Sequence, residues 1–210
     1  MFFDELTEFP RAVLDVLRQP LEDRQITISR VSGTIQYPAN VLFVGAMNPC
    51  ICGYYKDREK PCTCSLMSVK KYQQKISGPL LDRIDVILEI PRESLDTILN
   101  TVEQESSEQI RAHVLAAWRK QQERFAGTGI YANAHMTPKH LEQYVPLDQS
   151  CKDFLMQATQ HLLLSPRVIH RIIKLARTIA DMEVKECIDI SCLAEALQYR
   201  TKTLFVDNEL

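Results

Sequence analysis

The sequence predicts an α/β fold in which a partial parallel-sheet core with a β-hairpin insert and a cysteine-rich loop is followed by an all-helical domain. Two apolar runs, Val41–Ala46 and Ile84–Ile90, contain many β-branched residues, which is typical of strands buried on both faces. Apolar residues alternate over Gln25–Ala39, which predicts the hairpin. After Pro91 the apolar residues recur at helical spacing, so the sheet region ends there.

Length and composition define what kind of protein this is. The 210 residues suit two domains, which we place at 1–92 and 93–210. The net charge of -2 lacks the basic excess of a dedicated nucleic-acid module, so any contact with DNA requires a local patch or an assembly. No apolar stretch reaches the roughly 20 residues of a membrane span, and the N-terminus lacks a signal pattern. We therefore expect a cytoplasmic protein without membrane contact.

The chain opens with a short apolar run that ends in two carboxylates, Asp4 and Glu5. An Asp after a buried strand commonly holds Mg²⁺ beside nucleotide phosphates, and an adjoining Glu can polarise an attacking water. In the alternative interpretation, these acids only cap the helix predicted over Glu8–Leu21. The two interpretations are compatible with each other.

Asn48 follows the apolar run Val41–Ala46 and is the second candidate site residue. Ligands of open α/β sheets gather beyond the carboxyl ends of the strands, so an amide there is placed to orient a water or a phosphate. The alternative is an ordinary Asn-Pro turn. The hairpin between the two strands carries Arg24 and Arg30, which either are solvated or act on a substrate if the hairpin projects.

Four of the seven cysteines lie within fifteen residues, at Cys50, Cys52, Cys62 and Cys64. In a chain without a secretion signal, such a cluster favours metal ligation or free thiols over disulfides. Two pairs of thiolates that close one loop supply the four sulfur ligands of a structural Zn²⁺. Free thiols are the main alternative, and disulfides or an iron–sulfur cluster are the others. With four sulfur ligands, a zinc ion has no open position, so its role is structural.

Arg83 follows a predicted helix over Ser65–Ile76 and the helix-ending segment Ser77-Gly78-Pro79. It lies between Asp82 and Asp85, so one interpretation is an ion pair with either acid. The functional interpretation is that Arg83 presents its guanidinium to a phosphate bound by a neighbouring subunit.

The first helix of the second domain is predicted over Ser107–Phe125, with Ser107 as its N-cap. Its apolar stripe is expected to face the core, and it consists of Ile110, Val114, Ala117 and Trp118.

Further helices are predicted over 138–144, 147–164, 166–182 and 191–201. Ser165 and Pro166 specify the start of the third of these. Arg167 then lies in the first turn, where a cation is disfavoured by the helix dipole. It is therefore a better functional candidate than the arginines farther along.

Several segments together resemble the magnesium-chelatase-like AAA+ ATPases, and in particular a competence-related bacterial subgroup. They are FFDELTEFPRAVLDVLRQPLEDRQITISR, AMNPCICGYY, CTC, SGPLLDRID, ESSEQIR, SPRVIHRIIKLARTIAD and LAEALQYR, and they cover nearly the whole chain in order. The resemblance implies a truncated AAA+ core followed by an all-α lid domain.

The same resemblance implies a role for each candidate residue. Asp4 and Glu5 would be the Walker B pair, Asn48 sensor 1, Arg83 the arginine finger acting in trans, and Arg167 the best candidate for sensor 2. Gln25–Ala39 would be the pre-sensor hairpin. The implied cofactors are ATP and Mg²⁺, the implied partner is the chain itself in a hexameric ring, and DNA would bind through the assembled ring.

One departure from the family pattern decides what this chain can do alone. No G-x-x-x-x-G-K-S/T motif occurs, and Met1 already stands in the implied Walker B strand, as in an internal start, a split gene or a truncation. Because that motif supplies most of the grip on phosphates, we expect this chain to bind ATP poorly and not to hydrolyse it. The parent protein would then couple ATP hydrolysis to branch migration or unwinding of DNA.

Two other functions remain open at this point. The first is a non-enzymatic, zinc-stabilised interaction or chaperone-like module, and the second is the motor subunit of a metal chelatase. The resemblance also implies that the missing phosphate-binding strand belongs between the Val41–Ala46 and Ile84–Ile90 strands. We therefore expect unpaired edges and a loose sheet region over Met1–Pro91, whereas the helices from Ser107 onward fold independently.

Overall fold

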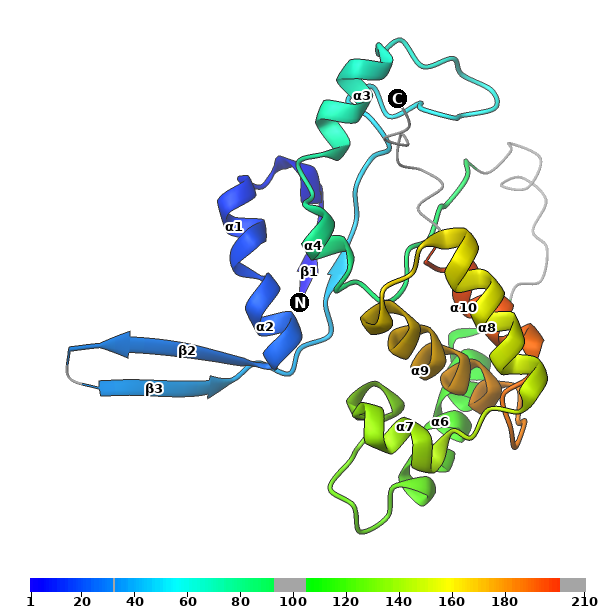
Figure 1. Cartoon of the computed structure of the whole chain (residues 1–210). Coiled ribbons are helices and arrows are strands. Elements are labelled where there is room, and N and C mark those ends of the chain that lie inside the picture. Colours follow the sequence, from blue (N-terminus) through cyan, green and yellow to red (C-terminus); the bar gives the residue numbers. More distant parts are fainter. Residues whose placement is uncertain (32, 93–104, 201–210) are drawn as a thin grey trace. The chain divides into compact units, whose positions relative to one another are not determined.

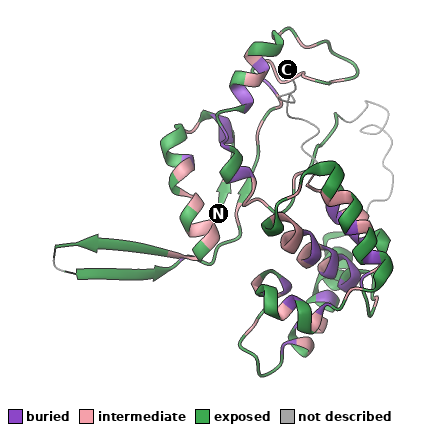
Figure 2. Cartoon of the chain, viewed as in Figure 1, coloured by how far each residue is buried: buried purple, intermediate pink, exposed green. Residues whose placement is uncertain are grey.

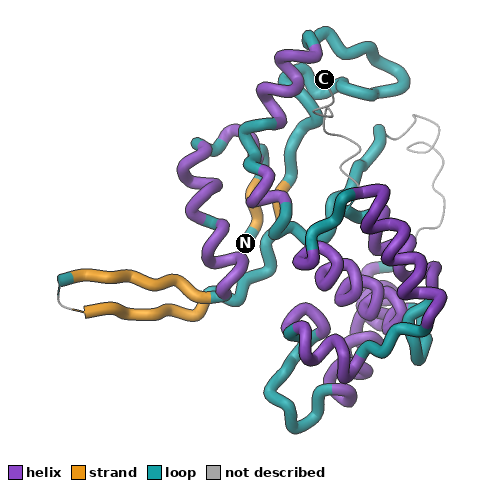
Figure 3. The backbone as a smooth tube through the Cα atoms, in the orientation of Figure 1, coloured by secondary structure: helices purple, strands orange, loops and turns teal. Residues whose placement is uncertain are grey.

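The computed structural model describes residues 1–31, 33–92 and 105–200 and shows a mixed α/β protein (Figures 1 and 3). The chain divides into two compact units, one within Met1–Arg92 and one within Glu93–Thr201. Each unit is described by itself. None of the helices in the described part is long and apolar enough to cross a membrane.

The first unit combines short helices with two small sheets around a modest apolar core. Its elements in chain order are β1 (Phe2–Phe3), η1 (Leu6–Glu8), α1 (Arg11–Val16), α2 (Arg18–Asp23), β2 (Gln25–Arg30), β3 (Gly33–Pro38), β4 (Val44–Gly45), α3 (Leu66–Gln73) and α4 (Gly78–Leu81). Its buried core residues are Leu6, Leu14, Ile76, Leu80 and Leu81.

Strands β1 and β4 pair in parallel, with Phe2 opposite Val44 and Phe3 opposite Gly45. Two further hydrogen bonds extend the pairing past the strand ends. The Ala46 N–H donates to the Phe3 carbonyl at 2.8 Å, and the Leu6 N–H donates to the Ala46 carbonyl at 2.8 Å. Both strands therefore end at the same edge, and the segments that follow them emerge side by side.

The sheet is much smaller than the sequence predicts. Of the predicted buried strand Val41–Ala46, only Val44–Gly45 is a strand, and Val44 is exposed. The prediction of a strand over Ile84–Ile90 was wrong, because the structure has no strand there. A strand needs a neighbouring strand to satisfy its backbone N–H and C=O groups. Among the described residues this sheet has only β1 and β4, so no strand lies beside Ile84–Ile90.

The predicted hairpin is confirmed, and it projects beyond the end of α2 (Figure 1). Strands β2 and β3 pair Ile26 with Tyr37 and Ile28 with Ile35, so these four side chains share one face. Nearly every residue of the hairpin is exposed (Figure 2). Its apolar face is therefore uncovered within the described part of the chain.

The helices of the first unit begin where local sequence signals place them. The predicted helix Glu8–Leu21 is split into η1, α1 and α2. The side chain of Ser65 caps α3 by accepting a hydrogen bond from the Ser68 N–H. Ser77 precedes α4, and Pro79 lies in its first turn, so this segment starts a new helix as well as ending the previous one.

The second unit is helical throughout its described residues. Its elements are α6 (Ser107–Arg124), η2 (Asn133–His135), α7 (Pro138–Tyr144), α8 (Gln149–Leu162), α9 (Pro166–Met182) and α10 (Ile190–Gln198). The bounds of α7 and α9 are those predicted, and the side chain of Ser165 caps α9 as expected. An apolar core shared by α7 to α10 is larger than that of the first unit.

Two predictions about α6 were wrong. Its N-cap is Ser106, which forms a capping box with Gln109, and not Ser107. The prediction that the apolar stripe is core was wrong for three of its four residues, because Ile110, Val114 and Trp118 are each more than 40% exposed. Ala117 is buried as predicted, and the polar Gln121 is buried with it. The last turn of α6 carries Arg124, which lies on the same face of the helix as these two residues and pairs with a buried carboxylate.

That carboxylate belongs to Asp181 in α9, which is 1% exposed. Arg124 from α6 forms a bidentate pair with it, with Nη1 at 2.8 Å from Oδ2. Arg177 Nη2 donates to Oδ1 at 2.9 Å, and Asn133 Nδ2 donates to Oδ2 at 2.8 Å. Arg177 also donates to the carbonyl of Glu186 at 2.7 Å. One carboxylate thus connects α6, η2, α9 and the turn after α9.

Replacing Asp181 should destabilise the second unit strongly. Asp181→Asn keeps the shape but leaves the buried Arg177 without a counter-charge, so we expect a loss of about 3–5 kcal/mol in the free energy of unfolding. Urea denaturation followed by circular dichroism measures this. Asp153→Asn is the matched control, because the Asp153 side chain is exposed and accepts a hydrogen bond from Gln149. This substitution should change the free energy of unfolding by less than about 0.5 kcal/mol. Equal effects of the two variants would contradict the role of the network.

The same carboxylate should make stability depend on acid pH. Burial raises the pKa of Asp181. Hydrogen bonds from Arg124 and Asn133 and the charge of Arg177 lower it by more than burial raises it, so the pKa lies below its ordinary value. The unfolded state therefore binds more protons in acid, and the stabilisation is complete above about pH 4 and is lost as pH falls through the folded pKa. Unfolding free energies measured from pH 7 to pH 3 should fall more steeply for the wild type than for Asp181→Asn.

Candidate functional site

The parallel pairing of β1 and β4 brings the first three predicted site residues to one edge. Asp4 and Glu5 follow β1, and Asn48 lies three residues beyond the end of β4. Glu5 has a left-handed backbone with φ 49° and ψ 49°, which a residue with a side chain rarely adopts. The Glu5 N–H donates to Asp4 Oδ1 at 3.0 Å. A strained backbone conformation of this kind is often found at functional sites.

A surface hollow of about 720 Å³ opens at this edge, and we call it the site hollow. Glu5 and Asn48 both line it, so the structure places these two predicted residues on one surface. The remaining lining residues are Glu8, Ile51, Ser68, Lys71, Tyr72 and Lys75. The mixture of carboxylates, ammonium groups, an amide and a hydroxyl suits a phosphorylated ligand with a divalent cation.

Lys71 and Lys75 are residues of the site hollow that the sequence analysis missed. Lys71 lies in α3 and Lys75 lies two residues after its end, and their i, i+4 spacing is a signal that the sequence contains. The ammonium of Lys75 lies 3.7 Å from a carboxylate oxygen of Glu8 and 5.5 Å from the centre of the Tyr72 ring. Because both charged side chains are largely exposed, this ion pair is screened and can exchange for a ligand.

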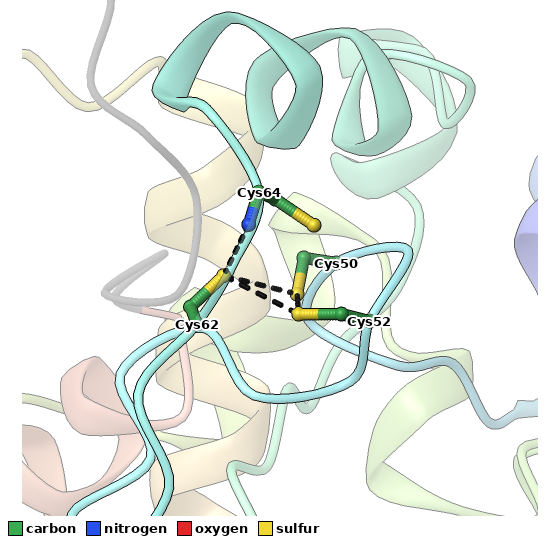
Figure 4. Close-up of side chains that lie close together, drawn as sticks. All are labelled: Cys50, Cys52, Cys62 and Cys64. Carbon is green, nitrogen blue, oxygen red and sulfur yellow. Dashed lines mark hydrogen bonds between the residues drawn. The ribbon is translucent and has the colours of Figure 1, made fainter.

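The four predicted metal ligands also come together, and we call them the four-cysteine cluster (Figure 4). Cys50 Sγ lies 3.3 Å from Cys52 Sγ and 3.7 Å from Cys62 Sγ, and Cys52 Sγ lies 3.4 Å from Cys62 Sγ. All four sulfur atoms, including that of Cys64, lie within 4.8 Å of one another. Disulfide sulfurs are about 2.05 Å apart, so these are free thiols.

The geometry of the cluster fits a tetrahedral zinc ion. A Zn–S bond of about 2.3 Å implies neighbouring sulfurs about 3.8 Å apart, close to the separations observed. Backbone N–H groups of Tyr54 and Thr63 and the neighbouring thiols lower the pKa of Cys52 to about 5. Although the Cys64 N–H lowers the pKa of Cys62, burial and the thiols of Cys52 and Cys50 raise it to about 12. A divalent cation would relieve this repulsion between thiolates.

Arg83 is held within its own unit and does not line the site hollow. Its Nε donates to the Arg18 carbonyl at 2.8 Å and lies 3.4 Å from a carboxylate oxygen of Glu22. Its Nη1 donates to the Pro79 carbonyl at 2.7 Å, and the side chain is 16% exposed. Glu22, which the sequence analysis did not consider, is thus an ion-pair partner of Arg83.

Arg167 belongs to the second unit, where it lies exposed in the first turn of α9. The geometry therefore unites Glu5 and Asn48 on one hollow, with Asp4 adjoining Glu5. Arg83 belongs to the same unit but does not line the hollow, and Arg167 belongs to the second unit.

Residues 1–98 match the family model described as magnesium chelatase, subunit ChlI, and residues 104–200 match the model of its C-terminal region. The two models together span nearly the whole chain, so the chain belongs to the magnesium-chelatase-like family.

Three proteins illustrate where in that family the chain lies. It is 42% identical over 201 residues to competence protein ComM of Haemophilus influenzae, an alignment that covers 95% of this chain and 38% of that protein. It is 38% identical to uncharacterized protein YifB of Escherichia coli and 31% identical to uncharacterized protein Rv2897c of Mycobacterium tuberculosis. These alignments cover 95% of this chain and 38% and 39% of those proteins, so the chain spans about two fifths of the length of these relatives.

The four-cysteine cluster should carry about one zinc ion per chain. Elemental analysis of protein purified without chelator measures this. Cys62→Ser should abolish the bound zinc, because a hydroxyl is a much poorer ligand than a thiolate. Cys187→Ser is the control, since Cys187 is exposed and lies outside the cluster. Protein without zinc and with four freely reacting thiols would show that this site does not bind the metal.

Proposed function

We propose that this chain is part of an AAA+ ATPase, with an incomplete core in the first unit and a lid in the second. One observation carries the proposal. The pairing of β1 with β4 puts Glu5 and Asn48 on one hollow, next to Asp4 and together with Lys71 and Lys75. Membership of the magnesium-chelatase-like family supports the use of nucleotide and Mg²⁺.

Each residue at the edge has a distinct task in this proposal. Asp4 would coordinate the Mg²⁺ that accompanies ATP, because a carboxylate is a preferred ligand of that ion. Glu5 polarises the attacking water, and Asn48 orients it by hydrogen bonding. Lys71 and Lys75 add positive charge where the terminal phosphate develops negative charge. The bound nucleotide supplies the phosphoryl group that is transferred to water.

The 210-residue sequence contains no phosphate-binding motif of the P-loop type. Backbone N–H groups and a lysine of that motif cradle the phosphates, so they have to come from another segment of a longer protein. We therefore propose that the 210-residue chain alone binds ATP no more tightly than about the millimolar range, equivalent to about 4 kcal/mol, and does not hydrolyse it.

The two arginines outside the hollow act from other places in this proposal. Arg83 is the arginine finger that reaches the phosphates bound by the next subunit of a hexameric ring. Arg167 is sensor 2, which reaches the nucleotide from the lid. Arg suits both roles because its planar guanidinium stays charged and binds phosphate through two N–H groups.

We propose DNA as the substrate of the longer protein, which would remodel it by branch migration or unwinding. The support is the similarity to a protein named as a competence protein and the exposed hairpin, whose β2 ends in Arg30. A metal-chelatase motor is the second candidate, because both matching family models describe a magnesium chelatase subunit. DNA that stimulates ATP hydrolysis would favour the first function, and insensitivity to DNA would favour the second.

Glu5→Gln tests the assignment of the catalytic edge in a longer protein that contains a P-loop upstream of this chain. Turnover of ATP should fall by about 10²–10⁴-fold, because the polarising carboxylate is lost, while ATP binding persists. Glu89→Gln is the control, since Glu89 is exposed and does not line the site hollow. A Glu5→Gln protein with wild-type turnover would exclude this role for Glu5, and a wild-type protein without turnover would favour an interaction module.

Mixing two inactive variants of the same longer protein tests Arg83. Arg83→Ala should abolish hydrolysis at the neighbouring subunit, and Glu5→Gln should abolish it within its own subunit. Rings that contain both variants should recover part of the activity, because some interfaces then pair an intact Glu5 with an intact Arg83. If activity stays absent at every mixing ratio, Arg83 is only the ion-pair partner of Glu22.

A further inference from the structure

Helix α3 lies between the two sites of the first unit. It begins two residues after Cys64, the last member of the four-cysteine cluster, and Ser65 caps it. Four of its residues or near neighbours line the site hollow, namely Ser68, Lys71, Tyr72 and Lys75. Its start thus adjoins the cluster in sequence, and one of its faces forms a wall of the hollow.

Two hydrogen bonds from the last turn of α3 hold the segments that carry Glu5 and Asn48. The Thr7 hydroxyl donates to the Tyr72 hydroxyl oxygen at 2.6 Å, and Thr7 lies two residues after Glu5. Gln73 Nε2 donates to the carbonyl of Pro49, the residue that follows Asn48, at 2.9 Å. One helical turn therefore contacts both segments of the candidate site.

The Thr7–Tyr72 hydrogen bond is buried, and the Gln73–Pro49 hydrogen bond is partly buried. Thr7 is 0% exposed, Tyr72 7% and Gln73 4%. A buried donor or acceptor that loses its partner cannot recover a hydrogen bond from solvent, so such contacts are specific in geometry. If α3 shifts, these two bonds have to shift or break, and the segments of Glu5 and Asn48 move with them.

We propose that Tyr72 and Gln73 are positioning residues through which a metal ion in the four-cysteine cluster sets the arrangement of Glu5 and Asn48. A metal ion closes the loop from Cys50 to Cys64 and so fixes where α3 starts. The last turn of α3 then holds the segments of Thr7 and Pro49. This consequence for catalysis rests on the proposed function, in which Glu5 polarises and Asn48 orients the attacking water. Binding of the metal ion by the four-cysteine cluster is then required for ATP hydrolysis.

Hydrogen exchange in the 210-residue chain tests this coupling without nucleotide. The amides of Leu6 and Ala46 are the probes, because both are hydrogen-bonded across the strand ends. Removing zinc with a chelator should speed their exchange by about tenfold, which is the contribution of one or two ordinary hydrogen bonds. Amides of α9, such as that of Ile172, serve as an internal reference and should not respond.

Two substitutions then distinguish coupling through Tyr72 and Gln73 from a general loss of structure in the first unit. Tyr72→Phe removes the hydroxyl that accepts from Thr7, and Gln73→Met removes the amide that donates to Pro49, while both keep nearly the size of the side chain. The double variant should still bind one zinc per chain, but Leu6 and Ala46 should exchange fast with or without metal. Tyr55→Phe and Gln74→Met are matched controls, since Tyr55 lies in the cysteine loop and Gln74 is exposed beside Gln73. Both should behave as the wild type.

Each outcome decides the matter. Unchanged exchange of Leu6 and Ala46 after zinc removal from the wild type would overturn the proposal, and so would a double variant that responds to zinc as the wild type does. A chain that binds no zinc would also overturn it. If the double variant does not fold, the wild-type measurement and Tyr72→Phe alone still decide. A failure of ATP hydrolysis in the longer protein would leave these exchange rates unaffected, so the two failures are distinguishable.

Discussion

The parallel hydrogen bonding between β1 and β4 is the interaction on which the candidate site depends. It joins segments more than forty residues apart with only two residues in each strand, and it aligns both strand ends. The carboxylates after one strand and the amide after the other then meet at one edge. Because the four-cysteine cluster begins two residues after Asn48, the same pairing also positions the start of the cysteine loop. A shift of one residue in this register would turn every side chain to the opposite face.

The two units are stabilised by different means. The second unit has a large apolar core and a fully paired buried carboxylate at Asp181. The first unit has a small apolar core, an exposed hairpin and a sheet of two short strands. Small cores are commonly supplemented by a bound metal or by a partner. A metal in the four-cysteine cluster and pairing with further strands would supply that support.

Electrostatics in the first unit are arranged so that charges can change partners. The Lys75–Glu8 pair is exposed and weak, so an anionic ligand can compete for the lysine. Arg83 is held more firmly, by two backbone carbonyls and Glu22. On the proposed function it has to leave these contacts to reach a neighbouring subunit. Assembly of a ring would therefore break the hydrogen bond from Arg83 to Pro79 of α4 and replace it with a contact to the nucleotide.

The sequence by itself determined the local features. A capping serine and a proline predicted the start of α9, and alternation predicted the hairpin, because these signals act over a few neighbouring positions. The spacing of the cysteines predicted a metal site, and the four sulfur atoms lie within 4.8 Å of one another, as such a site requires. The order of acids and amide after apolar runs likewise indicated Glu5 and Asn48, which line one hollow.

Only the tertiary structure decided which surfaces are buried and which distant residues meet. Ile84–Ile90 has strand composition, but no strand lies beside it in the described sheet, and a strand is defined by its partner. Ile110, Val114 and Trp118 of α6 stay exposed while Arg124 of the same helix pairs with Asp181, and an unpaired buried charge costs more than exposed apolar surface. Glu22 and Tyr72 acquired their roles from contacts with Arg83 and Thr7, which lie far away in the chain, and periodicity and spacing do not encode such contacts.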